Sequence, residues 1–289
     1  ALYSLMAYTG IKQGTYYPIG GFNQVIKSME KVCLKLGVKI LTDHEVKKIN
    51  IKDSKVHSIS TKDKEFKADT IVASADYAHV EEKLLDKKYR NYSLNYWNKK
   101  SFSPSSLLFY LGVSKKLTNL DHHTLFFDED IEKHGNDIYE NPIWPEKPLF
   151  YACCSSKTDE AVAPQGKENL FILIPIAAGL EDSNSLREKY FEIIMNRLEK
   201  FCNLDIRKNI EYNKSYCIND FKNDYNSFKG NAYGLANTLS QTANLKPKII
   251  NKKVRNLYYT GQLTVPGPGV PPSLISGKIV ADYIIKNNK

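Results

Sequence analysis

The sequence predicts a mixed α/β (α+β) protein in which the two ends of the chain build one domain and the middle builds another. Residues 20–76 combine a helical pattern with short strands. The middle carries long apolar runs at 106–113, 149–156 and 169–178. The tail returns to a strand and a helix from residue 256 onward. Strands that alternate with helices at both ends, around a central series of strands, indicate this class.

The first part predicts a helix, a strand, a β-meander and a further strand. Residues 20–37 place apolar side chains on one helical stripe, and Gly37 follows in the usual C-terminal position. VKIL (38–41) predicts a strand, and alternation at period two over 44–61 predicts a strand and hairpin. TIVA (70–73) is a short continuous apolar run, typical of a strand buried on both faces.

The middle and the tail differ in style. The apolar runs of the middle predict a mostly antiparallel sheet, accompanied by a helix within residues 184–202. NLYYTG (256–261) predicts a strand, and PSLISGKIVADYIIK (272–286) predicts a helix. Pro272 stands near the first turn of that helix, where a missing N–H costs nothing.

Composition limits the class of function. The chain has 289 residues and a net charge of +9, and it lacks a run of eighteen apolar residues, so no spanning helix is expected. The positive excess is spread out, which fits a lysine-rich solvated surface or a surface that meets anionic lipid headgroups. No recognisable nucleic-acid motif organises the tyrosines, so no nucleic-acid partner is expected. The start, ALYSLMAYTG, lacks an initiator Met and a signal peptide, so we expect the chain to begin partway into a longer protein.

The cysteines and histidines suggest no metal. The five cysteines form no C-x-x-C, which favours a reducing compartment and argues against a zinc site or a disulfide framework. Cys153 and Cys154 lie in an apolar run and are interpreted as small core residues. Adjacent side chains on a strand point in opposite directions, so His122 and His123 are expected to serve structure or surface rather than one metal ion.

The acidic residues suggest no catalytic pair. Asp128, Glu129 and Asp130 fit a solvated turn better than an acid–base pair. No G-x-S-x-G elbow supports a hydrolase. The sequence therefore identifies no catalytic residue and no proton acceptor.

The most informative stretch is TGQLTVPGPGVPPS (260–273). Gly267 and Gly269 match the first two positions of G-x-G-x-x-G, but Pro272 replaces the third glycine, so this is not a standard dinucleotide fingerprint. The glycines permit close backbone approach, the prolines rigidify the turn, and a helix whose free N–H groups point forward is expected to follow. A ligand-binding turn and a rigid connection without a ligand both remain open from chemistry alone.

Several stretches resemble the bacterial-type phytoene desaturases, which are FAD-dependent carotenoid desaturases of the amine-oxidase-like flavoprotein group. NLYYTGQLTVPGPGVPPSLISGKIVADYI resembles their C-terminal signature, and YYPIGGFNQVIKSMEKVCLKLGVKI resembles the segment where the chain re-enters the FAD domain. ADTIVASADYAHVEEKLL, SSLLFYLGV, LDHHTLFF and AVAPQGKENLFILIPI match further segments in order. The resemblance covers nearly all of the chain but not the family's N-terminal βαβ unit, so it implies a C-terminal fragment.

The resemblance implies a two-domain organisation. Residues 18–81 and 244–289 correspond to an incomplete, Rossmann-like FAD-binding domain. Residues 1–17 and 82–243 correspond to a substrate domain that faces the membrane. We expect the isolated chain to bind FAD weakly or not at all, and to be inactive.

The resemblance also implies cofactor contacts. Val46 matches the strand position whose backbone meets the adenine. Gly261 and Gln262 match the pair near the ribityl chain, although related flavoproteins often have an acid or a small residue where Gln262 stands. Gly267 belongs to the same glycine turn, and the positions that face the isoalloxazine are Gly269, Val270 and Pro271.

The implied reaction is FAD-dependent desaturation of a linear C40 precursor, from phytoene toward lycopene, by hydride transfer to the flavin. The expected partners are the lipophilic polyene and the membrane surface, on which the protein would dock peripherally from the cytoplasmic side. The alternatives are a later-acting carotenoid desaturase, saturase or isomerase of the same fold, or a non-catalytic lipid-binding module without flavin. The number of desaturation steps, the electron acceptor and the oligomeric state stay open.

Overall fold

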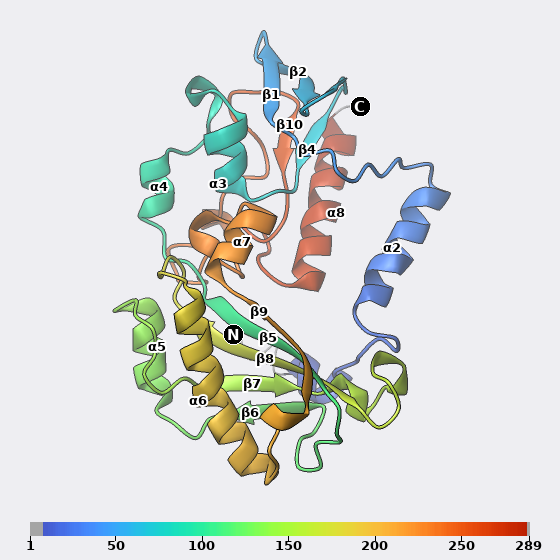
Figure 1. Ribbon diagram of the computed structural model, residues 1–289. Helices are drawn as coiled ribbons and strands as arrows, with labels where there is room; N and C mark the ends of the chain where they lie inside the picture. Colours follow the sequence, from blue (N-terminus) through green and yellow to red (C-terminus); the bar gives the residue numbers. More distant parts are fainter. Residues whose placement is uncertain (1–7, 288–289) are drawn as a thin grey trace.

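A computed structural model describes residues 8–287 (Figure 1). Residues 1–7, which belong to the segment 1–17 assigned to the substrate domain, and residues 288–289 lie outside the described part. The described chain forms three sheets and two hydrophobic cores. Its fold is mixed α/β with antiparallel sheets, as the sequence predicts.

Two small sheets lie in the upper part of Figure 1. The first is an antiparallel meander of β1 (Lys48–Lys52), β2 (Lys55–Ser60) and β3 (Glu65–Phe66). The second pairs β4 (Ile71–Ala73) in parallel with β10 (Leu257–Tyr259), so it joins distant parts of the sequence.

A single buried amide ties the meander to the second small sheet. The side chain of Asn256 accepts a hydrogen bond from Val56 N at 2.7 Å, and its amide nitrogen donates to Val56 O at 3.1 Å and to Asp69 O at 2.8 Å. The residue that precedes β10 therefore satisfies backbone groups of β2 and of the segment before β4, which fixes the two sheets relative to each other.

The lower part of Figure 1 is built on a five-stranded sheet in the order β6-β7-β8-β5-β9, in which every pairing is antiparallel. This confirms the expected antiparallel sheet of the middle segment. Its strands are β5 (Ser105–Val113), β6 (His123–Phe126), β7 (Phe150–Cys153), β8 (Glu168–Ile176) and β9 (Ile210–Tyr216). One face of the sheet is buried under α6 (Asn184–Cys202), through Phe109, Ile172 and their neighbours in the larger core. The opposite face stays partly open.

The remaining helices connect and flank these sheets. The α-helices are α2 (Asn23–Lys35), α3 (Tyr77–His79), α4 (Leu94–Asn98), α5 (Ile131–Tyr139), α7 (Ile218–Tyr225) and α8 (Val270–Asn287). Short π and 3-10 helices are η1 (Thr9–Gln13), η2 (Val80–Leu84), η3 (Lys87–Tyr89), η4 (Ser155–Lys157), η5 (Glu160–Val162), η6 (Arg207–Asn209), η7 (Phe228–Gly230) and η8 (Ala243–Leu245). Among residues 8–287, none of these helices has both the length and the apolar character needed to cross a bilayer.

Two strand predictions in the first part need correction. Residues 38–41 form no strand, and their apolar side chains are about half exposed, because no described strand lies beside them to pair with. β4 does form, but Val72 is 45% exposed, so the strand is not buried on both faces. The predicted helix over 20–37 is confirmed as α2 (Figure 1). None of its side chains is buried.

Candidate functional site

A cleft of about 520 Å³ opens where the parallel strands β4 and β10 end. The carboxyl ends of parallel strands are the usual ligand-binding edge of an open α/β sheet. The cleft is lined by the segment after β4, the segment after β10, the first turns of α8 and parts of α7 and the loop that follows it. Its lining residues include Ser74, Asp76, Tyr225, Asn231, Gly261, Gln262, Ser273 and Gly277. The structure therefore brings Gly261 and Gln262, two of the predicted cofactor residues, into one concave site.

Gly261 turns the chain sharply at the end of β10. Its φ is +103°, a backbone conformation that side chains strongly disfavour. Ser276, a fully buried residue of α8, accepts a hydrogen bond from the Gly261 N–H at 2.7 Å and also contacts the Thr260 hydroxyl. The helix thus holds the strand end in place, and the missing side chain leaves the backbone open to the cleft.

Gln262 is fixed by the loop that follows α7. Its side-chain amide donates to the Asn231 side chain at 3.4 Å. A Cβ atom on Gly234 would lie only 2.9 Å from the carbonyl oxygen of Gln262, so this loop packs directly against the strand end. The amide of Gln262 retains hydrogen-bonding capacity toward the cleft, as a donor and an acceptor.

The side of the cleft that follows β4 contains a partly buried carboxylate. Asp76 caps α3 by accepting from His79 N at 3.1 Å, and it also accepts from Phe228 N at 3.2 Å. Burial raises the pKa of Asp76, and these hydrogen bonds oppose the shift. Beside it, the ring of Tyr77 stacks on that of Tyr259 with centroids 3.8 Å apart. This wall is therefore rigid.

The glycine–proline turn lies next to a buried lysine that the sequence analysis missed. A Cβ atom on Gly267 would lie 3.4 Å from Cε and 3.5 Å from Nζ of Lys246. Lys246 is only 2% exposed, and its ammonium nitrogen has no hydrogen-bond partner among the described residues. Burial lowers the pKa of Lys246. The sequence gives no signal for it, because Lys246 is one of many lysines and its burial depends on the turn.

The start of α8 offers fewer backbone donors than expected. The helix begins at Val270, so Pro271 and Pro272 occupy its first turn and contribute no N–H. The N–H of Ser273 donates to Gly269 O at 2.9 Å. Val270 therefore carries the remaining donor of the turn, and the expectation of several free N–H groups is wrong for these described residues.

The other predicted cofactor residues lie outside the cleft lining. Gly267 is buried within the turn, whereas Gly269 and Val270 are exposed at the start of α8. Val46 precedes β1 rather than lying within a strand, and it packs against the smaller hydrophobic core. The structure thus places Gly261 and Gln262 in the cleft lining, and Val46 is not among the lining residues.

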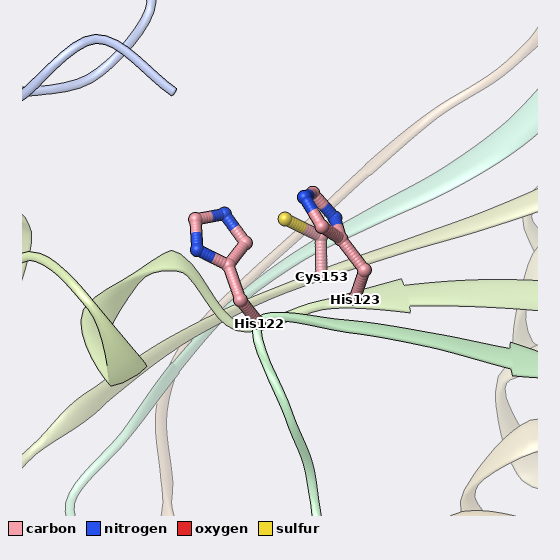
Figure 2. A group of neighbouring side chains, drawn as sticks. All are labelled: His122, His123 and Cys153. Atoms are coloured by element: carbon pink, nitrogen blue, oxygen red, sulfur yellow. The ribbon is translucent and has the colours of Figure 1, made fainter. Parts of the chain in front are cut away.

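The His–His–Cys region differs most from the sequence expectation. Cys154 is buried in the larger core as predicted, but Cys153 lies half-buried on the opposite face of the sheet. The side chains of His122 and His123 do not diverge, because only His123 belongs to β6. Figure 2 shows both imidazole rings beside the sulfur of Cys153, and the ring centroids are 4.2 Å apart. The expectation that the two histidine side chains point in opposite directions is therefore wrong.

The acidic segment has a structural role. Asp128 pairs with Arg197, and Glu129 lies 3.5 Å from Lys147. Asp130 caps α5 by accepting hydrogen bonds from the backbone N–H groups of residues 132 and 133. These carboxylates do not converge on one another, in agreement with their interpretation as a turn.

The chain is similar to enzymes of carotenoid metabolism. It is 40% identical to carotenoid 3,4-desaturase of Haloarcula japonica, over 99% of this chain and 58% of that protein. It is 27% identical to the zeta-carotene-forming phytoene desaturase of Myxococcus xanthus, over 99% of this chain and 55% of that protein. The chain therefore spans less than three-fifths of the length of these relatives.

The fold has relatives among solved structures. An oxidoreductase from Methanosarcina mazei superposes with a TM-score of 0.60 at 17% identity, over 92% of this chain and 55% of the other. A family model described as flavin-containing amine oxidoreductase matches residues 1–285. The cofactor of this family contains flavin, in agreement with the FAD that the sequence predicts. The chain belongs to the flavin-containing amine oxidoreductase family.

Proposed function

We propose that this chain is part of an FAD-dependent oxidoreductase that desaturates a linear C40 carotenoid precursor. The observation that carries the proposal is the 40% identity to a carotenoid 3,4-desaturase over 99% of the chain. The cleft at the ends of β4 and β10 supports it, because this edge is where open α/β sheets bind cofactors.

The residues of this site suit a flavin. The backbone of Gly261 is accessible beside the cleft because glycine has no side chain to cover it. The positive φ of Gly261 disfavours any residue with a Cβ, and the Ser276 hydroxyl accepts a hydrogen bond from its N–H. We assign Gly261 and Gln262 to the ribityl chain, and the turn of Gly267, Gly269, Val270 and Pro271 to the ring. Val46 is assigned to the adenine. The unpartnered ammonium of Lys246 adds a buried positive charge beside Gly267, which suits an anionic or electron-rich group.

The division of labour follows from this assignment. When bound, the flavin supplies a two-electron acceptor for the hydride that leaves the substrate. The chain itself positions the cofactor through the end of β10, and it contributes buried positive charge through Lys246. No group of the described chain is assigned as the proton acceptor.

The open face of the five-stranded sheet suits an apolar polyene. Its aromatic rings form a row, with Tyr110 and Phe171 at 5.3 Å between centroids and Phe171 and Tyr151 at 6.3 Å. Tyr110 is 40% exposed. Burial of its hydroxyl, and secondarily the nearby Tyr225 that lines the cleft, raise the pKa of Tyr110. An aliphatic substrate offers no polar handle, so we propose that this apolar row binds it by shape.

Two substrates are candidates within this reaction class. Phytoene is the substrate predicted from the sequence, and the Myxococcus xanthus relative is named for acting on it. Desaturation at the 3,4 position of a later carotenoid is the second candidate, favoured by the higher identity to the Haloarcula japonica protein. Because both substrates dissolve in lipid, we propose peripheral docking on the cytoplasmic face of the membrane.

Expression of the complete reading frame that contains this sequence tests the proposal. The purified protein should carry flavin absorbance, and cells that supply phytoene or a fully conjugated linear carotenoid should accumulate a product with a longer polyene. Consumption of phytoene selects the first candidate, and consumption of the later carotenoid alone selects the second. Absence of both flavin and product would instead support a non-catalytic lipid-binding module.

A further inference from the structure

The cluster of His122, His123 and Cys153 is not used by the proposed reaction. The three potential ligand atoms all lie within 4.8 Å of one another (Figure 2). The cluster is assembled by strand pairing, because His123 on β6 stands directly opposite Cys153 on β7. Directly opposed residues of an antiparallel pair project from the same face at close range. His122, just before β6, adds its ring beside that of His123.

Hydrogen bonds leave one nitrogen of His122 available. Its Nδ1 lies 2.6 Å from the hydroxyl of Thr158, and that hydroxyl donates to Ser155 O at 3.5 Å. In the tautomer in which Nδ1 donates to Thr158, Nε2 carries the lone pair. Nε2 is buried and has no partner among the described residues. An unpartnered buried nitrogen beside a thiol and a second imidazole needs a ligand to satisfy it.

His123 is oriented in the same way. Its Nδ1 lies 2.6 Å from the hydroxyl of Tyr151, which leaves Nε2 for a ligand. Outer hydrogen bonds that set the tautomer and direction of an imidazole are typical of metal-binding histidines.

We propose that His122, His123 and Cys153 bind one borderline-soft transition-metal ion, represented by Zn²⁺, and leave a fourth coordination position open. Two nitrogens and one sulfur suit such an ion, at about 2.0–2.1 Å for nitrogen and about 2.3 Å for sulfur. Neighbouring ligands of a tetrahedral ion are then about 3.3–3.6 Å apart, so the widest separation in the cluster, 4.8 Å, must shorten by about 1.2–1.5 Å. The partly exposed side chains of His123 and Cys153 leave room for that movement. Binding releases the Cys153 thiol proton to solvent, and no oxidation step is involved.

Cobalt and zinc titrations of the 289-residue chain test the site. The chain is stripped with a chelator under reducing conditions and titrated with Co²⁺, then with Zn²⁺. We expect one Co²⁺ per chain with a thiolate-to-cobalt charge-transfer band that Zn²⁺ abolishes. Cys153→Ser should lose the band, and His122→Gln or His123→Gln should weaken binding at least tenfold. Tyr151→Phe, which keeps all three ligands, should weaken binding by about 10–100-fold.

Two controls keep the result interpretable. Cys33→Ser and His57→Gln lie outside the cluster and should bind as the parent chain does. Zn²⁺ should also slow alkylation of Cys153 in the parent chain but not in His123→Gln, and circular dichroism checks that each variant is folded. A charge-transfer band that survives Cys153→Ser, or the absence of saturable binding to the parent chain, would overturn the proposal.

Discussion

The hydroxyl oxygen of Ser276 on α8 accepts a hydrogen bond from the backbone N–H of Gly261 at 2.7 Å. Through this contact the C-terminal helix fixes the sharp turn at the end of β10, where the cleft begins. Ser276 is fully buried, so its hydroxyl is held inside the protein against the strand end.

Ser276→Ala should therefore destabilise the chain by about 0.5–1.5 kcal/mol, because it removes the side-chain hydrogen bond to the Gly261 N–H. Urea unfolding measures the change. Ser273→Ala on the same helix is the matched control, because its backbone rather than its side chain makes the bond to Gly269. Equal stability losses in both variants would contradict the role assigned to Ser276.

Gly261→Ala should destabilise through backbone strain rather than through a clash. The added Cβ would meet Ser74 O at an ordinary 3.6 Å, but the φ of +103° is unfavourable for alanine. We expect a loss of about 1–2 kcal/mol and weaker flavin retention in the complete protein. Gly135→Ala, in α5 and with no atom within 4 Å of its new Cβ, should instead stabilise by about 0.5–1 kcal/mol. A neutral Gly261→Ala would refute the argument.

Lys246→Met should raise stability while weakening flavin binding. The buried ammonium has no partner, so its removal should stabilise the chain by about 1–3 kcal/mol at neutral pH. Because burial lowers the pKa of Lys246, the unfolded chain binds more protons between that lowered pKa and the ordinary lysine value of 10.5. The free energy of unfolding of the parent chain should therefore rise with pH through this window. The methionine variant should lack this rise.

The control for this experiment is Lys248→Met, since Lys248 is exposed two residues away. It should change stability by less than about 0.5 kcal/mol. Flavin retention is measured in the complete protein from the absorbance that survives gel filtration. If Lys246→Met retained flavin as well as the parent, Lys246 would not belong to the cofactor site.

Glu81→Gln should destabilise the smaller core. The buried carboxylate accepts hydrogen bonds from Asn91 N, Tyr92 N and the Tyr259 hydroxyl at 2.7–2.9 Å. The glutamine side chain replaces one acceptor oxygen with an NH2 group, which then faces at least one of these donors. We expect the free energy of unfolding to fall by about 1–3 kcal/mol. Thermal unfolding of the parent and the variant measures it.

The pH dependence of stability gives a second test of the role of Glu81. Desolvation raises the pKa of Glu81 above the ordinary glutamate value of 4.5, although its hydrogen bonds oppose the shift. The folded chain then binds more protons than the unfolded chain above pH 4.5, so this contribution to stability falls as the pH rises toward the raised value. Glu81→Gln should remove that fall. An unchanged pH slope in the variant would show that Glu81 titrates normally.

Local sequence patterns determined most of the secondary structure. Alternation at period two predicts β1 and β2, the long apolar runs predict β5 and β8, and helical periodicity predicts α6 and α8. These patterns can be recognised in the sequence because the spacing of apolar residues depends only on which face of their own element is buried. The end of β10 was likewise recognised as a candidate site from its glycines.

Tertiary structure decided what neighbours each side chain meets. Residues 38–41 carry a strand pattern but form no strand, because pairing needs a partner that local sequence does not specify. Lys246 belongs to the candidate site because the turn that contains Gly267 packs against its side chain. His123 met Cys153 only when β6 paired with β7 in the observed register. Burial, cross-strand pairing and helix starts depend on contacts between distant residues, and single-sequence periodicity carries no information about those contacts.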